Sequence, residues 1–275
     1  MDDYNDRFAD GHFELFGGLM KTDPILRAEN LSIGYEGKII MKDLSFEIPK
    51  GDIFIIMGGS GCGKSTLLRT LTGLIPAQAG RFWIRGVDFI HASKQERSTI
   101  CKHSGILYQS GALFSSMTLA ENVALPLQQY TSYAQDKIRQ IVSFKLALVG
   151  LGGYEEYYPA EISGGMRKRA GLARALALDP EIVYFDEPSA GLDPISSKNL
   201  DDLILEINKT LGTTIIVVTH ELPSIFAIGK NSIFLDKTVH TISAKGNPNE
   251  LLKNPPNEQV YEFLTRGEKY EKRTK

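Results

Sequence analysis

The chain has 275 residues, of which 42% are hydrophobic and 23% charged, close to the average usage of a soluble globular protein. Its 31 Lys and Arg against 33 Asp and Glu give a formal net charge of −2, which argues against bulk electrostatic binding to nucleic acid. The two cysteines, Cys62 and Cys101, exclude a disulfide-stapled secreted scaffold and indicate a reducing compartment.

The first 23 residues carry five acidic residues among the first fourteen. We predict a flexible N-terminal extension here, whose role the sequence does not reveal. This acidic start lacks the basic region and apolar run of a signal peptide. The longest clean apolar runs, residues 53–57 and 215–218, are strand-sized and far below the ~18 residues that a membrane-spanning helix needs. We therefore expect a cytoplasmic chain, which leaves docking on a membrane protein open.

Apolar and polar residues alternate over 25–35 and 43–51, which predicts half-buried antiparallel strands. Residues 53–57 are continuously apolar and run into glycine, as a strand buried on both faces does. The apolar residues of 65–74 have helical spacing.

Further along the chain, residues 105–109 are again strand-like, and we predict a loop over 111–127 and a helix-rich stretch to 149. Two more buried strands are predicted within 181–188 and 213–221, each after a helical segment. Alternating helices and strands imply a parallel sheet. The charged residues 267–275 are expected to fray.

The segment between the first buried strand and its helix fits G-x-x-x-x-G-K-[ST] at residues 58–65. The glycines let successive N–H groups turn toward one anion, and the helix presents its unpaired N-terminal donors there. Lys64 can bridge the β- and γ-phosphates of a nucleotide, and Ser65 can ligate Mg²⁺. A plain tight turn is the alternative, which the strand before and the helix after disfavour. The residues predicted to bind the nucleotide are Gly58, Gly59, Ser60, Gly61, Cys62, Gly63, Lys64, Ser65 and Thr66.

Cys62 inside this loop has two interpretations. A helix N-terminus lowers a thiol pKa, so a redox-sensitive thiol is one of them. We favour the other, that a small side chain fits there.

Two carboxylates, Asp186 and Glu187, follow the buried run 182–185. The carboxyl end of a parallel strand is where open α/β sheets bind ligands. We predict that Asp186 holds Mg²⁺ and that Glu187 polarises an attacking water, a general-base task worth about 10²–10⁴ in rate. Alone, the pair would be read as a solvated strand end or a helix cap.

A second anion site is predicted at Ser163, Gly164 and Gly165, which open a stretch of helical spacing. A hydroxyl, bare backbone N–H groups and the helix dipole meet there. A simple Ser N-cap is the alternative.

Three motifs carry a family resemblance: GGSGCGKST at 58–66, ISGGM at 162–166 and YFDEPSAGLD at 184–193. Together they resemble the ATP-binding subunits of ABC transporters over about residues 25–245. Met166 departs from the common pattern, which has Gln, as in one branch of the family. The resemblance implies an α/β fold: a P-loop (RecA-like), mainly parallel sheet core, an antiparallel β subdomain and an inserted α-helical signature subdomain. It divides the chain into an extension (1–23), an ATP-binding domain (24–245, helical subdomain about 110–172) and a C-terminal extension (246–275).

The same resemblance assigns roles to single residues. Tyr35 resembles the aromatic residue that stacks on adenine, with a buried strand tyrosine as the alternative. Gln109 resembles the glutamine that touches Mg²⁺ or its water and reports to the membrane partner. His220 resembles the switch histidine near the γ-phosphate, although most lone histidines are structural. Asp193 resembles the residue that crosses the dimer interface.

The resemblance also implies a mechanism. Two subunits stack head to tail, and each ATP lies between the phosphate loop of one and Ser163–Gly165 of the other. Water activated by Glu187 hydrolyses the ATP, and the homodimer opens. A separate integral-membrane permease on the inner membrane is driven by this cycle.

The cargo is suggested by similarity to the ATPases of Mla/Mce-type lipid transporters, at residues 111–127, in the SGGM motif with its basic helix, and at 255–267. We expect phospholipid cargo and an Mce-domain substrate-binding partner; the direction of transport is not in the sequence. The alternatives are an ABC ATPase for lipoprotein release, amino-acid import or cell division, and a soluble ABC ATPase acting on DNA or ribosomes. One cassette without sustained heptads disfavours the last.

Two smaller expectations concern surfaces. The run Arg167, Lys168 and Arg169 is interpreted as a solvated helix face rather than a nucleic-acid patch. Val260, Phe263 and Leu264 form an apolar helical face, which covers either the partner subunit or the chain's own domain.

Overall fold

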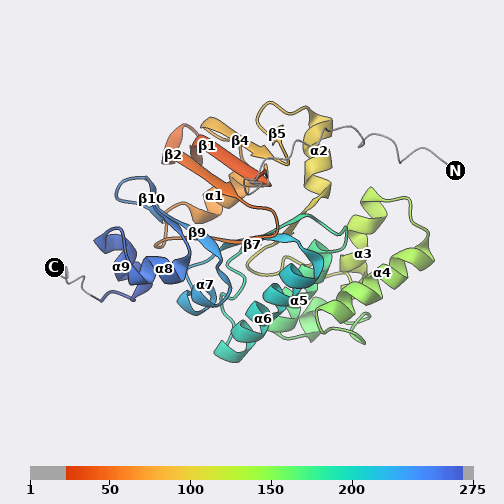
Figure 1. Cartoon of the computed structure of the whole chain (residues 1–275). Helices are drawn as coiled ribbons and strands as arrows, with labels where there is room; N and C mark the ends of the chain where they lie inside the picture. Colours follow the sequence, from red (N-terminus) through yellow and green to blue (C-terminus); the bar gives the residue numbers. More distant parts are fainter. Residues whose placement is uncertain (1–22, 269–275) are drawn as a thin grey trace, which may run out of the picture.

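Two β-sheets organise residues 23–268, the part of the chain that the structure, a computed structural model, describes. The predictions for residues 1–22 and 269–275 therefore lie outside the described residues. The antiparallel sheet has the order β2-β1-β4-β5 and the larger sheet the order β10-β9-β3-β8-β7-β6 (Figure 1). The strands are β1 (Leu26–Tyr35), β2 (Lys38–Ile48), β3 (Ile53–Met57), β4 (Ala79–Ile84), β5 (Val87–Asp88), β6 (Ser104–Leu107), β7 (Ile182–Asp186), β8 (Thr214–Val218), β9 (Asn231–Asp236) and β10 (Thr241–Gly246).

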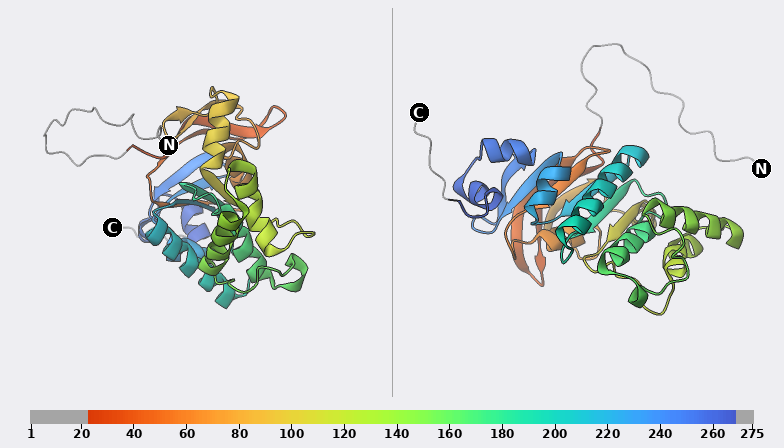
Figure 2. Two further views of the ribbon diagram at one scale, coloured as in Figure 1. Left: turned by 90° about the vertical axis from the view of Figure 1, so that its right-hand side faces the viewer. Right: turned by 90° about the horizontal axis from the view of Figure 1, so that it is seen from below.

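Pairing in the larger sheet is parallel from β9 to β6, and only the edge strand β10 runs antiparallel to its neighbour. The predicted fold class is confirmed: a mainly parallel core sheet, an antiparallel sheet and a group of helices. The helices are α1 (Lys64–Leu71), α2 (Lys94–Lys102), α3 (Leu119–Tyr130), α4 (Gln135–Leu148), the 3₁₀ turn η1 (Pro159–Glu161), α5 (Gly164–Ala175), α6 (Pro194–Leu211), α7 (Leu222–Ile228), α8 (Pro248–Lys253) and α9 (Glu258–Leu264). Seen from below, α3 and α4 lie at one end of the molecule and α8 and α9 at the other (Figure 2).

The continuous apolar run of β3 is explained by cores on both faces of the parallel sheet. Ile53, Ile55 and Met57 pack into a core shared with helices α3 to α9. Phe54 and Ile56 point the other way, into a core shared with α1 and the antiparallel sheet. Because neighbouring side chains of a strand face opposite sides, a strand between two cores must be apolar throughout.

The predicted loop over 111–127 is wrong in its second half, because α3 begins at Leu119. A capping box nucleates it: Glu121 N–H donates to Thr118 Oγ1 at 3.2 Å, and Thr118 N–H donates to Glu121 Oε2 at 2.8 Å. The helix contains Pro126 in its interior. Proline ordinarily disfavours a helix interior, which is why this segment resembles a loop in sequence.

The apolar face of α9 is covered by the chain itself. Val260 and Leu264 are buried in the helical-side core, and the Phe263 ring packs edge-on against Phe234 of β9 at 5.2 Å between centroids. The apolar face of α9 therefore packs against the chain's own domain, which is the second of the two interpretations given for it.

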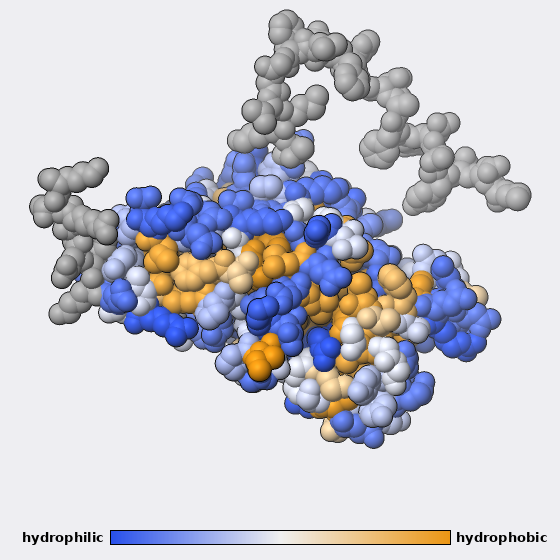
Figure 3. All heavy atoms as spheres, turned by 60° about the horizontal axis from the view of Figure 1, so that its bottom comes forward, coloured by the Kyte–Doolittle hydropathy of each residue, from blue (hydrophilic) through white to orange (hydrophobic). Residues whose placement is uncertain are grey.

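On the face that Figure 3 shows, apolar residues extend across the middle of the molecule, and polar residues surround them along the rim. In residues 23–268, we find no helix whose length and apolar character would allow it to cross a membrane.

Candidate functional site

The loop between β3 and α1 is shaped by glycine. Gly58, Gly61 and Gly63 have φ angles of 149°, 73° and 97°, which residues other than glycine rarely adopt. At Gly58 a Cβ atom would also lie 2.5 Å from the Leu235 carbonyl oxygen. Gly63 is the N-cap of α1 and offers no side-chain acceptor to the helix. The first N–H groups of α1 are therefore available to an anion.

Lys64 and Cys62 are both buried in this loop. The Lys64 ammonium donates to the carbonyl oxygens of Gly58 and Gly59, at 2.9 and 3.2 Å. A positive charge is thus held directly over the loop. Burial raises the pKa of the Cys62 thiol, which favours the small-side-chain interpretation over a reactive thiolate.

Ser65 and Asp186 meet across the end of the sheet. Ser65 Oγ donates to Asp186 Oδ1 at 3.0 Å. Burial raises the pKa of Asp186, and the hydrogen bond from Ser65 opposes that rise. A hydroxyl and a partly buried carboxylate are hard oxygen donors, and a nearby cation would offset the cost of burying the negative charge. In residues 23–268 no group of three or more His, Cys, Asp or Glu is placed to hold a metal ion. Ser65 and Asp186 therefore fit a Mg²⁺ ion whose other ligands are oxygens of a bound molecule.

Glu187 sits at a bend in the chain just beyond β7. Its φ of 50° is left-handed, and its N–H donates to the Val218 carbonyl oxygen at 2.8 Å, which fixes the backbone to β8. Glu187 Oε1 lies 2.8 Å from His220 Nδ1, a spacing that requires the ring to donate if the carboxylate is ionised. Glu187 Oε2 is buried and has no hydrogen-bond partner in the described chain. This carboxylate therefore keeps one oxygen free to accept a proton.

The parallel register brings these groups to one edge. The neighbouring strands β3, β8 and β7 end at Met57, Val218 and Asp186. In the register of the sheet, Val218 of β8 pairs with Ile56 of β3 on one side and with Asp186 of β7 on the other. The phosphate-type loop, the acidic pair and His220 all follow these strand ends. The convergence is what the buried strands of the sequence predict.

Gln109 and Tyr35 flank this edge. Leu107 ends β6 opposite Phe185, so Gln109 follows the strand next to the one that carries Asp186 and Glu187, and it is exposed. Tyr35 is 40% exposed, which excludes the alternative of a buried strand tyrosine. Its hydroxyl accepts from Arg69 Nη1 of α1 at 3.2 Å, and a hydrogen bond with Thr66 lowers its pKa.

Ser163, Gly164 and Gly165 stand apart from these groups. Ser163 is the N-cap of α5, and its Oγ accepts from Met166 N–H at 3.2 Å. No hydrogen bond or ion pair within residues 23–268 joins the three residues to the loop over 58–65. Asp193 similarly caps α6, where its carboxylate accepts from the N–H groups of Ile195 and Ser196. The loop at 58–65 and Ser163–Gly165 thus lie at the starts of two different helices, α1 and α5.

The basic run of α5 is not a solvated face, and that interpretation is wrong. Lys168 is buried and Arg167 and Arg169 are half-buried. Each side chain donates to backbone carbonyls of a neighbouring loop, because loop carbonyls lack the partners that helices and strands supply. The bonds are Arg167 to Ile162 (2.9 Å), Lys168 to Pro188 (2.6 Å) and Ala190 (2.5 Å), and Arg169 to Val149 (3.2 Å).

Arg174 continues this arrangement further along α5. It donates to the carbonyl oxygens of Gly111 and Ala112, at 3.0 and 2.9 Å. Gly171 lets the helix approach closely, since a Cβ atom there would lie 2.8 Å from Gly111 O. The segment after Gln109 is thereby held on α5, a contact that no sequence pattern indicated.

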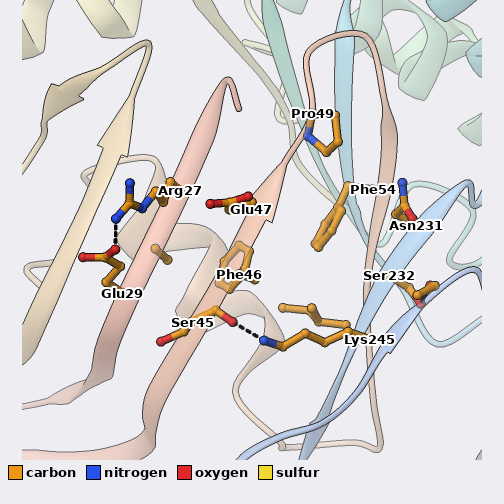
Figure 4. Close-up of a pocket in the computed structure, with 13 residues that line it drawn as sticks. Arg27, Glu29, Ser45, Phe46, Glu47, Pro49, Phe54, Asn231, Ser232 and Lys245 are labelled. Carbon is orange, nitrogen blue, oxygen red and sulfur yellow. Dashed lines mark hydrogen bonds and ion pairs between the residues drawn. The ribbon is translucent and has the colours of Figure 1, made fainter. Parts of the chain in front are cut away.

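Among the hollows of residues 23–268, one of about 750 Å³ opens between the two sheets and is lined by Phe46, Phe54, Lys245 and ten further residues (Figure 4). None of the predicted site residues lines it. A groove of about 300 Å³ lies beside the segment after β6, lined among others by Tyr108, Phe114, Tyr130 and Arg174.

Comparison with known proteins identifies a family and several relatives that match most of this chain. The profile of the family described as ABC transporter matches residues 41–190. The intermembrane phospholipid transport system ATP-binding protein MlaF is 39% identical in Haemophilus influenzae, covering 87% of this chain and 90% of that protein. In Escherichia coli K12 the protein of that name is 40% identical, over 82% and 83%.

A second relative is longer than this chain. The probable ribonucleotide transport ATP-binding protein mkl of Mycobacterium leprae is 45% identical over 74% of this chain, which spans only 59% of that protein.

Solved structures agree on the fold. The dimeric post-hydrolysis structure of the ATP-binding cassette MJ0796 bound to ADP and Pi matches with a TM-score of 0.73 and 26% identity, over 81% of this chain and 98% of that one. CbiO1 of Clostridium perfringens, part of the ABC transporter complex cbiONQ, matches with a TM-score of 0.77 and 28% identity, over 89% and 97%.

Proposed function

The chain belongs to the ABC transporter family, and from that premise we propose that two copies bind Mg-ATP between them, hydrolyse it and drive a membrane permease. The observation that carries the proposal is the meeting of the phosphate-type loop, Asp186, Glu187 and His220 at one edge of the parallel sheet. Each group there has the chemistry that phosphoryl transfer needs.

Binding uses the loop and its surroundings. The free N–H groups at the start of α1 and the Lys64 ammonium receive the phosphates. Tyr35, exposed beside α1, stacks on the adenine ring. Ser65, Asp186 and Gln109 would hold Mg²⁺, which, when bound, neutralises phosphate charge.

Hydrolysis depends on Glu187. Its carboxylate accepts a proton from water while the water oxygen bonds to the γ-phosphorus and the bond to the β–γ bridging oxygen breaks. His220 donates to Oε1 and so holds the carboxylate in place. Lys64 and the backbone donors stabilise the charge that builds on the phosphate oxygens.

Dimerisation follows from the separation of the two anion-binding ends. Ser163–Gly165 of one copy close over the ATP on the loop of the other, and Asp193 lies in that interface. The γ-phosphate bridges the two copies, so its release removes the bridge and the dimer opens. Head-to-tail packing of two identical subunits completes two sites at once.

Gly165→Asp tests this two-sided site. A Cβ atom at Gly165 comes no closer than 3.8 Å to Leu192, so the variant can fold, while its carboxylate repels the phosphates of ATP bound to the other copy. We expect phosphate release to be lost and ATP binding to remain. Gly152→Asp is the matched control, an exposed glycine with similarly loose contacts outside the site. Preserved hydrolysis in Gly165→Asp would show that Ser163–Gly165 do not complete the site.

The permease is proposed to dock in the groove beside Phe114 and Tyr130, on the cytoplasmic face of the bacterial inner membrane. Arg174 binds the carbonyls of Gly111 and Ala112 in the segment that joins Gln109 to this groove. A movement of the permease in this groove would thus reach Gln109 at the nucleotide site through the few residues that join them.

Phospholipid is the proposed cargo, with an Mce-domain subunit as a further partner. The support is that the two MlaF proteins match over 82–87% of this chain and 83–90% of their own lengths. Ribonucleotide transport is the second candidate, since mkl has the higher identity of 45%, although the chain spans 59% of it.

Purification from native membranes in mild detergent separates these candidates. A permease with an Mce-domain protein and bound phospholipid is the expected result. A different permease with bound ribonucleotide would retain the ATPase and discard the lipid cargo. Recovery with ribosomes or DNA alone would overturn the transport function.

A further inference from the structure

A buried lysine connects the two anion-binding ends of one chain. We propose that Lys168 is a positioning residue, which transmits the position of Ser163–Gly165 to the loop that follows Glu187 in the same subunit. The inference rests on the proposed function, since it concerns how the two ATP sites of the dimer influence each other.

The contacts of Lys168 support this role. Its side chain is 6% exposed, and its ammonium donates to Pro188 O at 2.6 Å and to Ala190 O at 2.5 Å. It forms no ion pair within residues 23–268. Burial lowers the pKa of Lys168, and the charge of Glu187 opposes that change. A buried ammonium is costly unless its protons are bonded, so these two carbonyls are held firmly to α5.

The loop reached by Lys168 is short and lies between two predicted site residues. Glu187 precedes it and Asp193 follows it. Ala190 N–H donates to Glu187 O at 3.2 Å, which folds the loop back on the carboxylate's own backbone. A shift of Pro188 and Ala190 would therefore move Glu187.

The helix itself is the rigid connection. Lys168 lies one turn beyond Gly164, the first residue of α5, and a Cβ atom added at Gly165 would lie 3.8 Å from Leu192 Cδ2, at the far end of the loop. When Ser163–Gly165 engage the ATP of the partner copy, the first turn of α5 and Lys168 move as one body. Lys168 then carries that movement to Glu187, which serves the chain's own ATP.

Lys168→Met tests the connection, because it keeps the apolar stem and removes the donor. We expect kcat for phosphate release to fall by about 10- to 100-fold, the scale of a misplacement of about 1 Å. ATP affinity of the loop should not change. Amide hydrogen exchange at residues 188–193 should rise even without nucleotide, a readout that does not depend on hydrolysis. Lys168→Arg retains a donor and is expected to recover part of both.

The matched control is Lys145→Met. Lys145 is also buried, at 2% exposure, and its ammonium lies 2.5 Å from Asp179 Oδ1. Removing it should lower stability without changing exchange at 188–193 or kcat of the remaining folded protein. Equal losses in both variants would show that Lys168 only supports the fold, and the inference would be wrong.

Mixed dimers locate the effect. With Glu187→Gln in one copy, only the site served by the intact Glu187 hydrolyses. Lys168→Met in the copy that carries this Glu187 should lower the rate, whereas the same change in the other copy should lower it less. Equal effects in both placements, or unchanged exchange at 188–193, would overturn the inference. A wild type without ATPase activity would instead overturn the proposed function, and this inference with it.

Discussion

Glu187 is fixed by a backbone bond and by a bond at one carboxylate oxygen, while its other carboxylate oxygen has no partner in the described chain. Its backbone is bonded to β8, Oε1 lies 2.8 Å from His220 Nδ1, and Oε2 is buried without a partner in the described chain. A general base needs this combination, because it must be fixed in place and still accept a proton.

Glu187→Gln removes the proton acceptor and preserves the shape. We expect hydrolysis to fall by about 10²–10⁴-fold, since general-base catalysis contributes that range. ATP should still bind, so an ATP-bound dimer should accumulate and elute earlier in size-exclusion chromatography. The control is Glu221→Gln, whose Oε1 lies 3.7 Å from the other nitrogen of His220. Absence of a trapped dimer would refute the base assignment.

Asp201 is a buried carboxyl that the proposed chemistry does not use. It is 5% exposed, its Oδ2 accepts from Ser224 Oγ at 2.8 Å, and its Oδ1 has no partner in the described chain. Burial raises the pKa of Asp201 from 3.8 to about 6. The folded state therefore binds more protons than the unfolded state between these values, and the free energy of unfolding falls as pH rises through that window.

Asp201→Asn should remove this pH dependence. We expect the variant to be more stable than the wild type at pH 8, by on the order of 1–3 kcal/mol, since one unit of pKa corresponds to about 1.4 kcal/mol. The advantage should shrink as the pH falls toward about 4, where wild-type Asp201 is protonated in the folded state. Urea unfolding at several pH values measures it. Asp136→Asn changes an exposed carboxylate that pairs with Arg139 and is the control; a variant advantage that does not grow with pH would contradict the assignment.

At the scale of elements, the sequence predicts some ends of helices but not the contacts that a helix makes with neighbouring loops. Thr118 and Glu121 form a capping box whose residues stand in the primary structure, yet Pro126 makes the same segment resemble a loop. The bonds of Lys168 and Arg174 follow from which loops happen to lie beside α5, and this depends on the packed fold. Local patterns predict the ends of a helix better than its neighbours.

Asn122 joins α3 to the loop before it. The side chain is fully buried, its Oδ1 accepts from Phe114 N–H at 2.8 Å, and its Nδ2 donates to the carbonyls of Phe114, Met117 and Thr118. Asn122→Ala leaves these groups unpaired, so we expect a loss of about 1–3 kcal/mol in the free energy of unfolding. Thermal and urea unfolding measure it. Gln128→Ala alters an exposed amide on the same helix and should have little effect; similar losses in both would show that the bonds of Asn122 contribute nothing specific.

At the scale of the whole molecule, the sequence predicts one half of the site better than the other. The loop at 58–65, Asp186 and Glu187 follow buried strands, and parallel pairing of those strands brings their ends together. Ser163–Gly165 lie at the start of a different helix, and within residues 23–268 no hydrogen bond or ion pair joins them to the loop at 58–65. The role that we propose for them depends on a second copy, and neither hydrophobic periodicity nor the packing of one chain contains information on that copy.

Two inactive variants should therefore restore activity when mixed. Lys64→Ala damages the phosphate loop, and Gly165→Asp damages the opposing end. A mixed dimer joins the intact loop of one variant to the intact Ser163–Gly165 of the other, so one of its two sites is whole. About half of the dimers in an equimolar mixture are mixed, which limits the expected rate of phosphate release to about a quarter of wild type. Lys64→Ala mixed with Glu187→Gln is the control, because both changes fall on the same side and no whole site can form. If the first mixture stays as inactive as the control, each chain does not lend Ser163–Gly165 to its partner, and the site must be completed in another way.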